Sequence, residues 1–290
     1  MMNVITLAKK YAALLDETYR ENAKTAVLES DPALAREGAN ANELVIPKLT
    51  MDGLADYSRN SGYVSGDVSL TWETVKFSYE RGRMFSVDAM DNEESQSIAF
   101  GALAGEFVRT KAVPELDAFR FAAIAGTDGI SKAEGKLETG EAAAAAVRKA
   151  VSAMDAAEVP SEDRVLFITP VLKGMIDDMD TTKSRAVMAS FTDVVVVPQS
   201  RFYSAVKLAD GVTDGEESGG YSKAAGAKNI NFMIVHKGAV IQFTKHALPK
   251  IINPANNPDA DSWKYGYRSY GICAVYPNKA AGVYCHTAAE

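Results

Sequence analysis

The chain has little cysteine and little histidine for its length. Two cysteines, Cys273 and Cys285, occur among 290 residues, each within an apolar, strand-like stretch. A disulfide framework needs more cysteines in a smaller chain, so both are predicted to be buried free thiols. The three histidines, His236, His246 and His286, lack the spacing of metal ligands, and we expect no metal site.

Recognisable catalytic motifs are also missing. The chain has no GxxxxGK[ST] phosphate loop and no GxGxxG after a strand. The run from Gly62 to Gly66 has its serine one place too late for a nucleophile elbow. Acidic pairs such as Asp177-Asp178 are interpreted as solvated charge. Because triads are assembled from residues distant in sequence, these absences weigh against catalysis without disproving it.

Positive charge and long apolar runs are scarce too. The 31 Lys and Arg are outnumbered by 38 Asp and Glu, so the net charge is −7. That balance argues against a dedicated nucleic-acid binder but leaves room for local basic patches. No 18 consecutive residues are apolar, and residues 1–15 lack the pattern of a signal peptide, so we expect a soluble cytosolic product. The 47% hydrophobic content is typical of a globular protein of one or two domains.

The N-terminal segment has the pattern of an amphipathic helix. Apolar residues recur at helical spacing over residues 3–29, and Pro32 follows shortly afterwards. No apolar partner for this stripe lies close in sequence. An arm that packs on another subunit would explain it.

A projecting ribbon is predicted next. Residues 44–49 predict a short strand, which Pro47 restricts to a sheet edge, and residues 51–66 form a turn-rich connection. In the following strand the apolar alternation changes phase between Trp72 and Val75, which indicates a β-bulge or a strong twist. Because an isolated ribbon is marginally stable, we expect it to lie on another surface.

The rest of the chain mixes helices and strands. A long spine helix is expected from the acidic residues 91–94 to residue 125, with an interruption at Pro114. Further helices are expected over 141–157 and from Thr169 onward. The remaining predictions are strands at 81–87, 164–169, 194–197, 230–236, 239–244, 265–276 and 282–287, and loops at 126–140, 209–229 and 253–261. The apolar run 194–197 is typical of a central strand buried on both faces, and the loop 209–229 is predicted to be mobile.

An aromatic cluster lies near the C-terminus. Trp263, Tyr265 and Tyr267 share one face of the predicted strand, with Tyr270 close by. Such a cluster could be a platform for a sugar or a base. At strand spacing, a packing or interface surface is the favoured interpretation.

An ordered set of segments resembles the major capsid proteins of tailed bacteriophages, which have the Hong Kong 97-type fold. No single segment is a strong motif, but they occur in the family's order and span most of the chain. The segments are GLADYSRNSGY at 53–63, ERGRMFSVDAMDNEE at 80–94, VPELDAFR at 113–120, KHALPK at 245–250, DSWKYGYRSY at 261–270 and NKAAGVY at 278–284.

The resemblance implies an α+β capsid fold with an N-terminal arm, an extended β-ribbon loop, a peripheral domain with a spine helix, and an α/β axial domain. The arm would need a neighbour, which agrees with its unpartnered apolar stripe. The implied division is arm 1–43, extended loop 44–88, peripheral domain 89–135 with 238–270, and axial domain 136–237 with 271–290.

The resemblance also implies a structural role without catalysis, cofactor or metal. Copies of the chain would form the hexamers and pentamers of an icosahedral virion shell, assembled in the host bacterial cytoplasm. Other implied partners are scaffolding and portal proteins, and double-stranded DNA touching the inner face without sequence specificity; no membrane is involved. Because the chain starts almost at the arm, we expect a mature form or a separate scaffolding protein.

Several residues of the ribbon and spine are candidates for contacts between subunits. Ordinary helix capping and solvated charge explain each charged one alone equally well. Charge reversal at Arg81 or Arg83 is expected to block assembly while the monomer stays folded. The candidates are Trp72, Arg81, Arg83, Asp88, Asp91, Glu94 and Arg268.

Two alternatives remain open at the level of sequence. An encapsulin-like nanocompartment would share the fold and enclose a cargo enzyme in place of DNA. An α/β enzyme built on residues 141–237 would need a deep pocket with a perturbed carboxylate or histidine.

Overall fold

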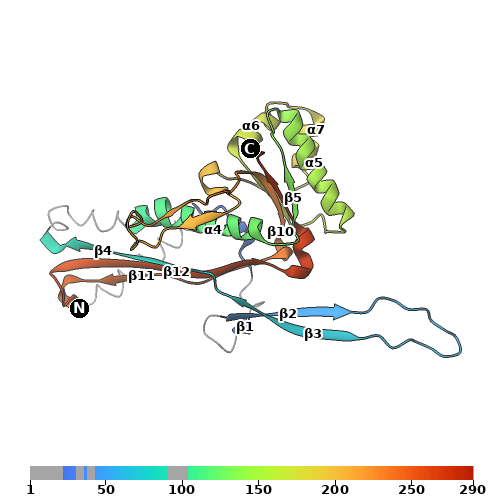
Figure 1. Cartoon of the computed structure of the whole chain (residues 1–290), viewed down its shortest axis with the longest axis horizontal. Coiled ribbons are helices and arrows are strands. Elements are labelled where there is room, and N and C mark those ends of the chain that lie inside the picture. Colours follow the sequence, from blue (N-terminus) through green and yellow to red (C-terminus); the bar gives the residue numbers. More distant parts are fainter. Residues whose placement is uncertain (1–21, 31–35, 38–42, 91–103, 290) are drawn as a thin grey trace.

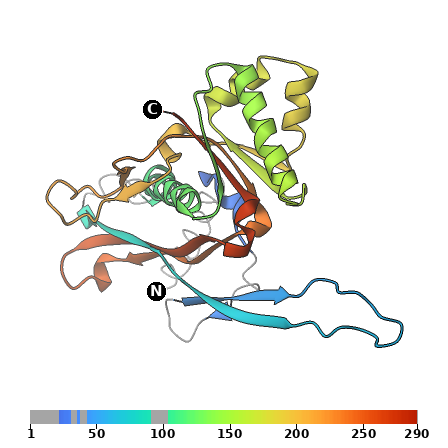
Figure 2. The same ribbon diagram turned by 45° about the vertical axis from the view of Figure 1, so that its right-hand side comes forward.

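The computed structural model describes residues 22–30, 36–37, 43–90 and 104–289. These residues form three parts: a compact α/β body, a long sheet with a helix lying along it, and a hairpin that projects from the junction of the two (Figure 1). Turning the molecule by 45° shows the hairpin still pointing away from the other two parts (Figure 2).

A five-stranded mixed sheet forms the centre of the body. Its outer pairs, β5 with β13 and β6 with β7, are parallel, and the inner pairs are antiparallel. From edge to edge the strands are β5 (Ser131–Glu134), β13 (Val283–Thr287), β10 (Ile230–His236), β6 (Arg164–Ile168) and β7 (Asp193–Val196).

Helices cover both faces of this sheet, which explains why its inner strands are mostly apolar on both faces. On one face Phe167 packs on Phe121 of α4 (Val113–Gly126), with ring centroids 5.1 Å apart. On the other face the neighbouring Leu166 packs in a cluster with Val147. The helices on this second face are α5 (Gly140–Ala156), α6 (Pro170–Asp177) and α7 (Thr182–Met188).

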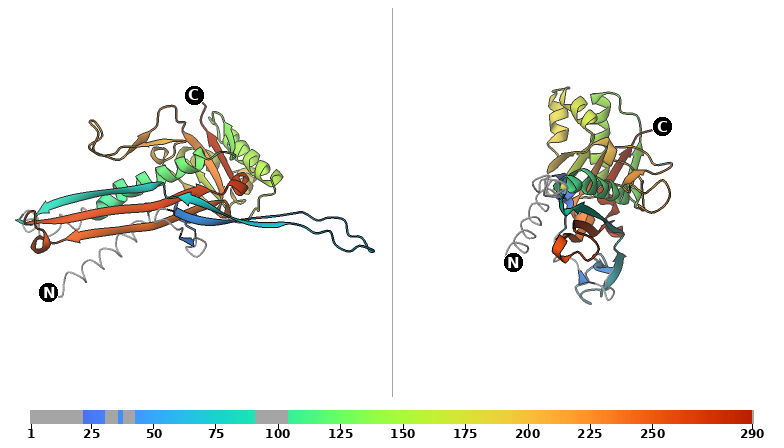
Figure 3. Two further views of the ribbon diagram at one scale, coloured as in Figure 1. Left: turned by 60° about the horizontal axis from the view of Figure 1, so that its bottom comes forward. Right: turned by 90° about the vertical axis from the view of Figure 1, so that its left-hand side faces the viewer.

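The long sheet consists of three antiparallel strands that run out from the body (Figure 3). They are β11 (Val240–Ile252), β12 (Ser262–Val275) and β4 (Tyr79–Asp88), in the order β11-β12-β4. β12 pairs with β4 from Gly271 opposite Tyr79 to Ser262 opposite Asp88. The register between β11 and β12 shifts once, between Thr244 and His246.

The spine helix lies along one face of the long sheet. Its described part is helical from residue 104, passes through a π-helical segment η3 (Val108–Ala112) and continues as α4. Pro114 sits in the first turn of α4. A proline removes one backbone donor and crowds the preceding turn, and a wider π-turn relieves both effects. The helix therefore passes the proline without ending.

The hairpin, residues 43–76, is built from β2 (Glu43–Met51) and β3 (Val68–Lys76). Their register is unbroken from Glu43 opposite Lys76 to Met51 opposite Val68. The short β1 (Arg36–Glu37) pairs with residues 44 and 45 of β2, so β2 is the middle strand in the order β1-β2-β3. The expectation that Pro47 makes this an edge strand is therefore wrong.

Most of the predicted elements are confirmed, and four further expectations need correction. Of the bulge or strong twist expected between Trp72 and Val75, the bulge is absent, because the register there is regular. The loop 126–140 contains the strand β5, which pairs with β13. The expected central strand at 194–197 is β7, which lies at the edge of the sheet.

The fourth correction concerns the loop 209–229, which was expected to contain no strand; its predicted mobility stays a prediction. It contains β9 (Tyr221–Lys223), which pairs with β8 (Val206–Leu208), and its first part is bound to β4. Of the helix predicted over 3–29, residues 3–21 lie outside the described part, and residues 26–28 form a 3-10 turn. The predicted start of the spine at 91–94 also lies outside it.

Candidate assembly surfaces

The hairpin carries apolar side chains on different faces at its base and farther out. At the base, Val75 and Phe77 pack on Ile241 and Ile272 of the long sheet. Farther out the even-numbered face is apolar and exposed: Val68 is 70%, Leu70 54% and Trp72 47% accessible. The change of phase in the sequence therefore marks the point at which the hairpin leaves its own subunit.

The hairpin tip, residues 52–67, is a loop that presents large apolar groups to solvent. Its two strands are joined across the base by the Asp52 carboxylate, which accepts the Asp67 N–H at 2.8 Å. Ser58 and Gly62 form an isolated β-bridge, and the rings of Tyr57 and Tyr63 lie 4.8 Å apart. The exposed apolar residues of the tip are Leu54, Tyr57, Tyr63 and Val64.

The second candidate surface centres on Arg81 in β4. Its Nε donates to Glu115 Oε1 of the spine helix at 2.7 Å, and its Nη2 donates to the carbonyl of Ala209 at 2.6 Å. The hydroxyl of Tyr79 donates to the same Glu115 oxygen at 3.3 Å. Burial, reinforced by Glu115, raises the pKa of Tyr79 well above its usual range. Arg81 therefore joins the strand, the spine helix and the loop after β8.

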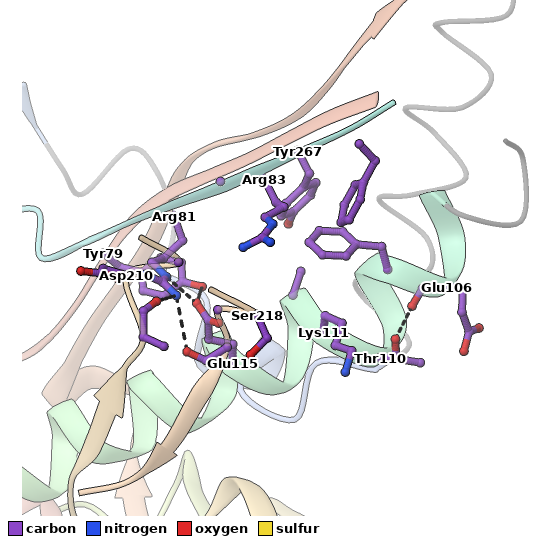
Figure 4. A pocket seen from close by; sticks show the side chains of 18 residues that line it. Tyr79, Arg81, Arg83, Glu106, Thr110, Lys111, Glu115, Asp210, Ser218 and Tyr267 are labelled. Atoms are coloured by element: carbon purple, nitrogen blue, oxygen red, sulfur yellow. Dashed lines mark hydrogen bonds and ion pairs between the residues drawn. The ribbon is translucent and has the colours of Figure 1, made fainter. Parts of the chain in front are cut away.

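Arg83 makes a similar contact two residues along the same face of β4. Its Nη2 donates to the carbonyl of Glu217 at 2.9 Å. The guanidinium points into a groove of about 660 Å³ between β4, the spine helix and the loop 209–220 (Figure 4). Apolar side chains from Phe85, Phe107 and Tyr267 contribute to its lining, with Glu106 and Lys111 of the spine.

The other candidate contact residues lie apart from this pair. Arg268 forms an ion pair with Glu80 on the opposite face of the long sheet, and both side chains are more than half exposed. Asp88, at the far end of β4, accepts the backbone N–H of Met90 at 2.9 Å. Trp72 lies on the hairpin. Asp91 and Glu94 fall outside the described residues.

The contacts of Arg81 and Arg83 within the chain change how they can be tested. A charge reversal at either position would disturb the subunit itself, because each guanidinium donates to a backbone carbonyl of its own chain. Contacts of these candidates with another subunit stay a prediction.

A buried polar network fixes the root of the N-terminal segment, and the sequence reading missed it. Asp117 of α4 is fully buried and accepts from the N–H of Lys24 at 2.9 Å and the hydroxyl of Thr25 at 2.7 Å. Arg120, one turn along, donates to Thr25 Oγ1 at 3.1 Å and pairs with Glu29 at 3.4 Å. The sequence did contain a signal for this network, because Asp117 and Arg120 place opposite charges three residues apart on an otherwise apolar helix face.

The aromatic cluster near the C-terminus is a packing surface, as the favoured interpretation predicted. Tyr265 and Tyr267 are buried beneath the spine helix, where Tyr267 meets the ring of Phe107 edge-on at 5.9 Å. Tyr270 stacks on Phe77 at 4.7 Å and so joins the long sheet to the base of the hairpin.

The cysteines are buried free thiols, as predicted. Burial raises the pKa of Cys273 and of Cys285 to about 12, which keeps both protonated and unreactive. Burial also lowers the pKa of His286, which stacks on Phe232. Within the described ranges no three His, Cys, Asp or Glu side chains gather as metal ligands would, and no helix is long and apolar enough to cross a membrane.

The chain resembles known proteins in structure but matches none of those compared in sequence. No family model and no curated protein matches the sequence. The structure of Gordonia phage Cozz is similar with a TM-score of 0.61 at 12% identity, covering 93% of this chain and 87% of that chain. The mature capsid of bacteriophage PhiM1 has a TM-score of 0.59 at 10% identity, over 86% and 83% of the two chains.

A third similar structure is a virus-like particle from Pyrococcus furiosus. Its TM-score is 0.57 at 10% identity, and the match covers 96% of this chain and 98% of that chain. At such identities the likeness concerns the fold. The chain has the α+β Hong Kong 97-type fold of tailed-phage capsid proteins.

Proposed function

We propose that this chain is the major capsid subunit of a tailed bacteriophage, and that its copies assemble into an icosahedral shell around double-stranded DNA. The fold supports a shell protein. The observation that carries the proposal is the hairpin, whose apolar surface no part of the described chain covers.

Exposed apolar side chains are concentrated on the hairpin. Of the thirteen large apolar residues that are exposed in the described part of the chain, eight lie between Met51 and Trp72. Monomeric proteins rarely expose apolar surface so densely. Full burial of an exposed Leu or Val contributes about 1.5–3 kcal/mol, and these partly exposed side chains would each contribute a fraction of that, so the set together can support a stable contact.

The direction of the hairpin makes a contact with another copy the natural way to bury these groups. The tip points away from both the body and the long sheet (Figures 1 and 2). A hairpin that lies on a different patch of the next copy makes a head-to-tail contact, and such contacts form rings when the rotation from copy to copy closes on itself. Rings of five and six copies are the units from which an icosahedral shell is built in this proposal.

The remaining assignments follow from the proposed shell. The virion is the proposed location, with assembly in the host bacterial cytoplasm. Scaffolding and portal proteins are proposed partners, and DNA would contact the inner face without base recognition. The division into arm 1–43, extended loop 44–88, peripheral domain and axial domain also stays a proposal. β4, at the end of the proposed extended loop, pairs along its length with β12 of the long sheet.

A second candidate function is a nanocompartment shell that encloses a cargo enzyme. The similarity over nearly the whole length of the virus-like particle from Pyrococcus furiosus favours it. The contents of purified particles separate the two functions. Nuclease-protected double-stranded DNA in particles from infected cells supports the capsid, and a co-purifying enzyme without such DNA supports the compartment.

Substitution on the hairpin tests whether its exposed face drives assembly. The purified chain is concentrated with and without a crowding agent, and particles are counted by electron microscopy. Leu70→Asp should abolish particles and leave the far-UV circular dichroism spectrum unchanged, because residue 70 touches solvent in the isolated subunit. Val171→Asp is the matched control, since Val171 is 65% exposed on α6 and should not affect assembly. Normal particles from Leu70→Asp would contradict the proposal.

A further inference from the structure

The loop between β8 and β9 crosses from the body to the long sheet. This strap, residues 209–220, begins and ends beside the spine helix and reaches the helix-side face of β4. Its base is closed by the Ala209 N–H, which donates to the Gly220 carbonyl at 2.9 Å. The strap therefore spans two parts of the fold that are distant in sequence.

The strap has an internal framework of its own. The Asp210 carboxylate accepts from the N–H groups of Val212 and Thr213, both at 2.8 Å, and from the Thr213 hydroxyl at 2.6 Å. Glu216 accepts the Asp210 N–H at 3.2 Å and pairs with Lys207 of β8. A turn held by charged acceptors is preformed, so its carbonyls can be presented in fixed directions.

Those carbonyls meet the Arg81-Gly82-Arg83 triplet of β4. Arg81 Nη2 lies 2.6 Å from the Ala209 carbonyl and 3.4 Å from that of Gly220, at the two ends of the strap. Arg83 Nη2 lies 2.9 Å from the carbonyl of Glu217, near its middle. Hydrogen bonds from a charged donor are stronger than neutral ones. Both ends of the strap and its middle are thus held by one strand.

The strap also fits closely around Arg83. A Cβ atom at Gly211 would lie 3.1 Å from Arg83 Nη1, and one at Gly219 would lie 3.3 Å from it. Both glycines have positive φ angles, +78° and +66°, which side chains adopt at a cost. The backbone conformation therefore favours glycine at both positions, and the strap passes close to the guanidinium there.

We propose that the strap is a latch, fastened by Arg81 and Arg83, that holds the body and the long sheet at a fixed angle. The two parts also share a buried cluster that includes Val240, Cys273 and Phe167, and they are connected by short segments between strands and by the spine.

The long sheet and the spine each contain an irregular segment. The register of β11 and β12 shifts between Thr244 and His246, and the spine has its π-turn at 108–112. Arg81 and Arg83 lie on the part of the long sheet past the register shift. A tie from the body to these residues resists bending between the two parts, and its release lets the angle vary. The inference does not depend on the proposed function.

Hydrogen exchange of the strap amides tests the fastening. Arg83→Met keeps most of the side-chain stem and leaves the Arg81–Glu115 pair in place, so the subunit should stay folded. Exchange in peptides covering 209–220 should become about tenfold faster, as expected for the loss of a hydrogen bond to a charged group. Arg109→Met is the matched control, because Arg109 pairs with Glu106 on the spine surface and does not touch the strap. If amide hydrogen exchange in residues 209–220 is unchanged in Arg83→Met, Arg83 does not hold the strap and this part of the proposal is wrong.

A distance measurement tests the fixed angle. The native cysteines are buried, so spin labels can be placed at Val171→Cys on the body and Met90→Cys beyond β4, both exposed positions. In the unassembled subunit the distance distribution should be narrow, and adding Arg81→Met with Arg83→Met should broaden it. If the double variant does not fold, Arg83→Met alone should give a smaller broadening. An equally narrow distribution in a folded variant would refute the latch.

Discussion

The Arg81 guanidinium lies 2.7 Å from the Glu115 carboxylate and joins an edge strand of the long sheet to the spine helix. The side chain of Arg81 is 24% exposed and that of Glu115 is 11% exposed, so the pair is largely shielded from water. Removing one partner of a shielded pair leaves the other charge poorly solvated. Removing Arg81 from this ion pair should therefore measurably lower the stability of the subunit.

Arg81→Met should lower the free energy of unfolding by about 2–3 kcal/mol, less than a fully buried pair would lose because this one is partly solvated. Urea unfolding followed by circular dichroism measures the change. Arg268→Met is the comparison, because Arg268 and Glu80 are both more than half exposed and should contribute less than about 1 kcal/mol. An equal decrease in the free energy of unfolding in the two variants would show that shielding from water does not strengthen the Arg81–Glu115 pair.

Asp117→Ala should destabilise the protein by about 3 kcal/mol, because it leaves buried backbone donors at Lys24 and Thr25 without their acceptor. It should also speed hydrogen exchange of residues 22–30. Asp177→Ala removes a half-exposed carboxylate that pairs with Lys173, and its effect should be within about 0.5 kcal/mol. A small effect at Asp117 with unchanged exchange would contradict the anchoring of the segment.

Acidification should loosen the strap at Asp210. Hydrogen bonds from Thr213 and Val212 lower the pKa of this carboxyl from 3.8 to about 2, with Lys207 also favouring the charged form. Arg81 and Glu216 are the other charged groups near it. Because the pKa is lower in the folded state, the carboxylate's contribution is complete above about pH 4 and disappears as the pH falls through 2.

Amide resonances of Thr213 report this titration directly in a nuclear magnetic resonance experiment. They should shift with a midpoint near pH 2, and Asp210→Asn should remove the transition. A midpoint near pH 4 in the folded protein would show that the strap does not hold the carboxylate as the structure indicates.

Both thiols should react with a disulfide reagent only after unfolding. Cys273 and Cys285 are buried, and their raised pKa of about 12 leaves almost no thiolate at neutral pH. The reagent should therefore find no reactive thiol in the native subunit and two in urea. One rapidly reacting thiol in the native protein would contradict the placement of that cysteine in the core.

The sequence predicted those elements whose own residues show a regular apolar pattern. α5 follows from helical spacing of Val147 and Met154, and β6 from an apolar run before Pro170. β5 was missed because Ser131–Glu134 is polar and becomes a strand only through pairing with β13. β7 was misplaced since an apolar run does not distinguish a central strand from an edge strand.

The candidate surfaces, too, could be predicted where a local sequence pattern marks them and not where they depend on contacts between distant residues. The phase change at Trp72 was visible in the sequence, but its cause was not, because the regular register removes the bulge and leaves a change of packing partner. The network of Asp117, Arg120 and Thr25 joins residues more than 90 positions apart. Contacts of that range depend on the completed fold, as do the strap's bonds to Arg81 and Arg83.

Cryo-electron microscopy of particles assembled from the wild-type chain tests the central claim most directly. The proposal predicts closed icosahedral shells in which the apolar face at Val68, Leu70 and Trp72 is buried against a neighbouring copy. A chain that stays monomeric at high concentration, or shells in which this face remains exposed to solvent, would contradict it.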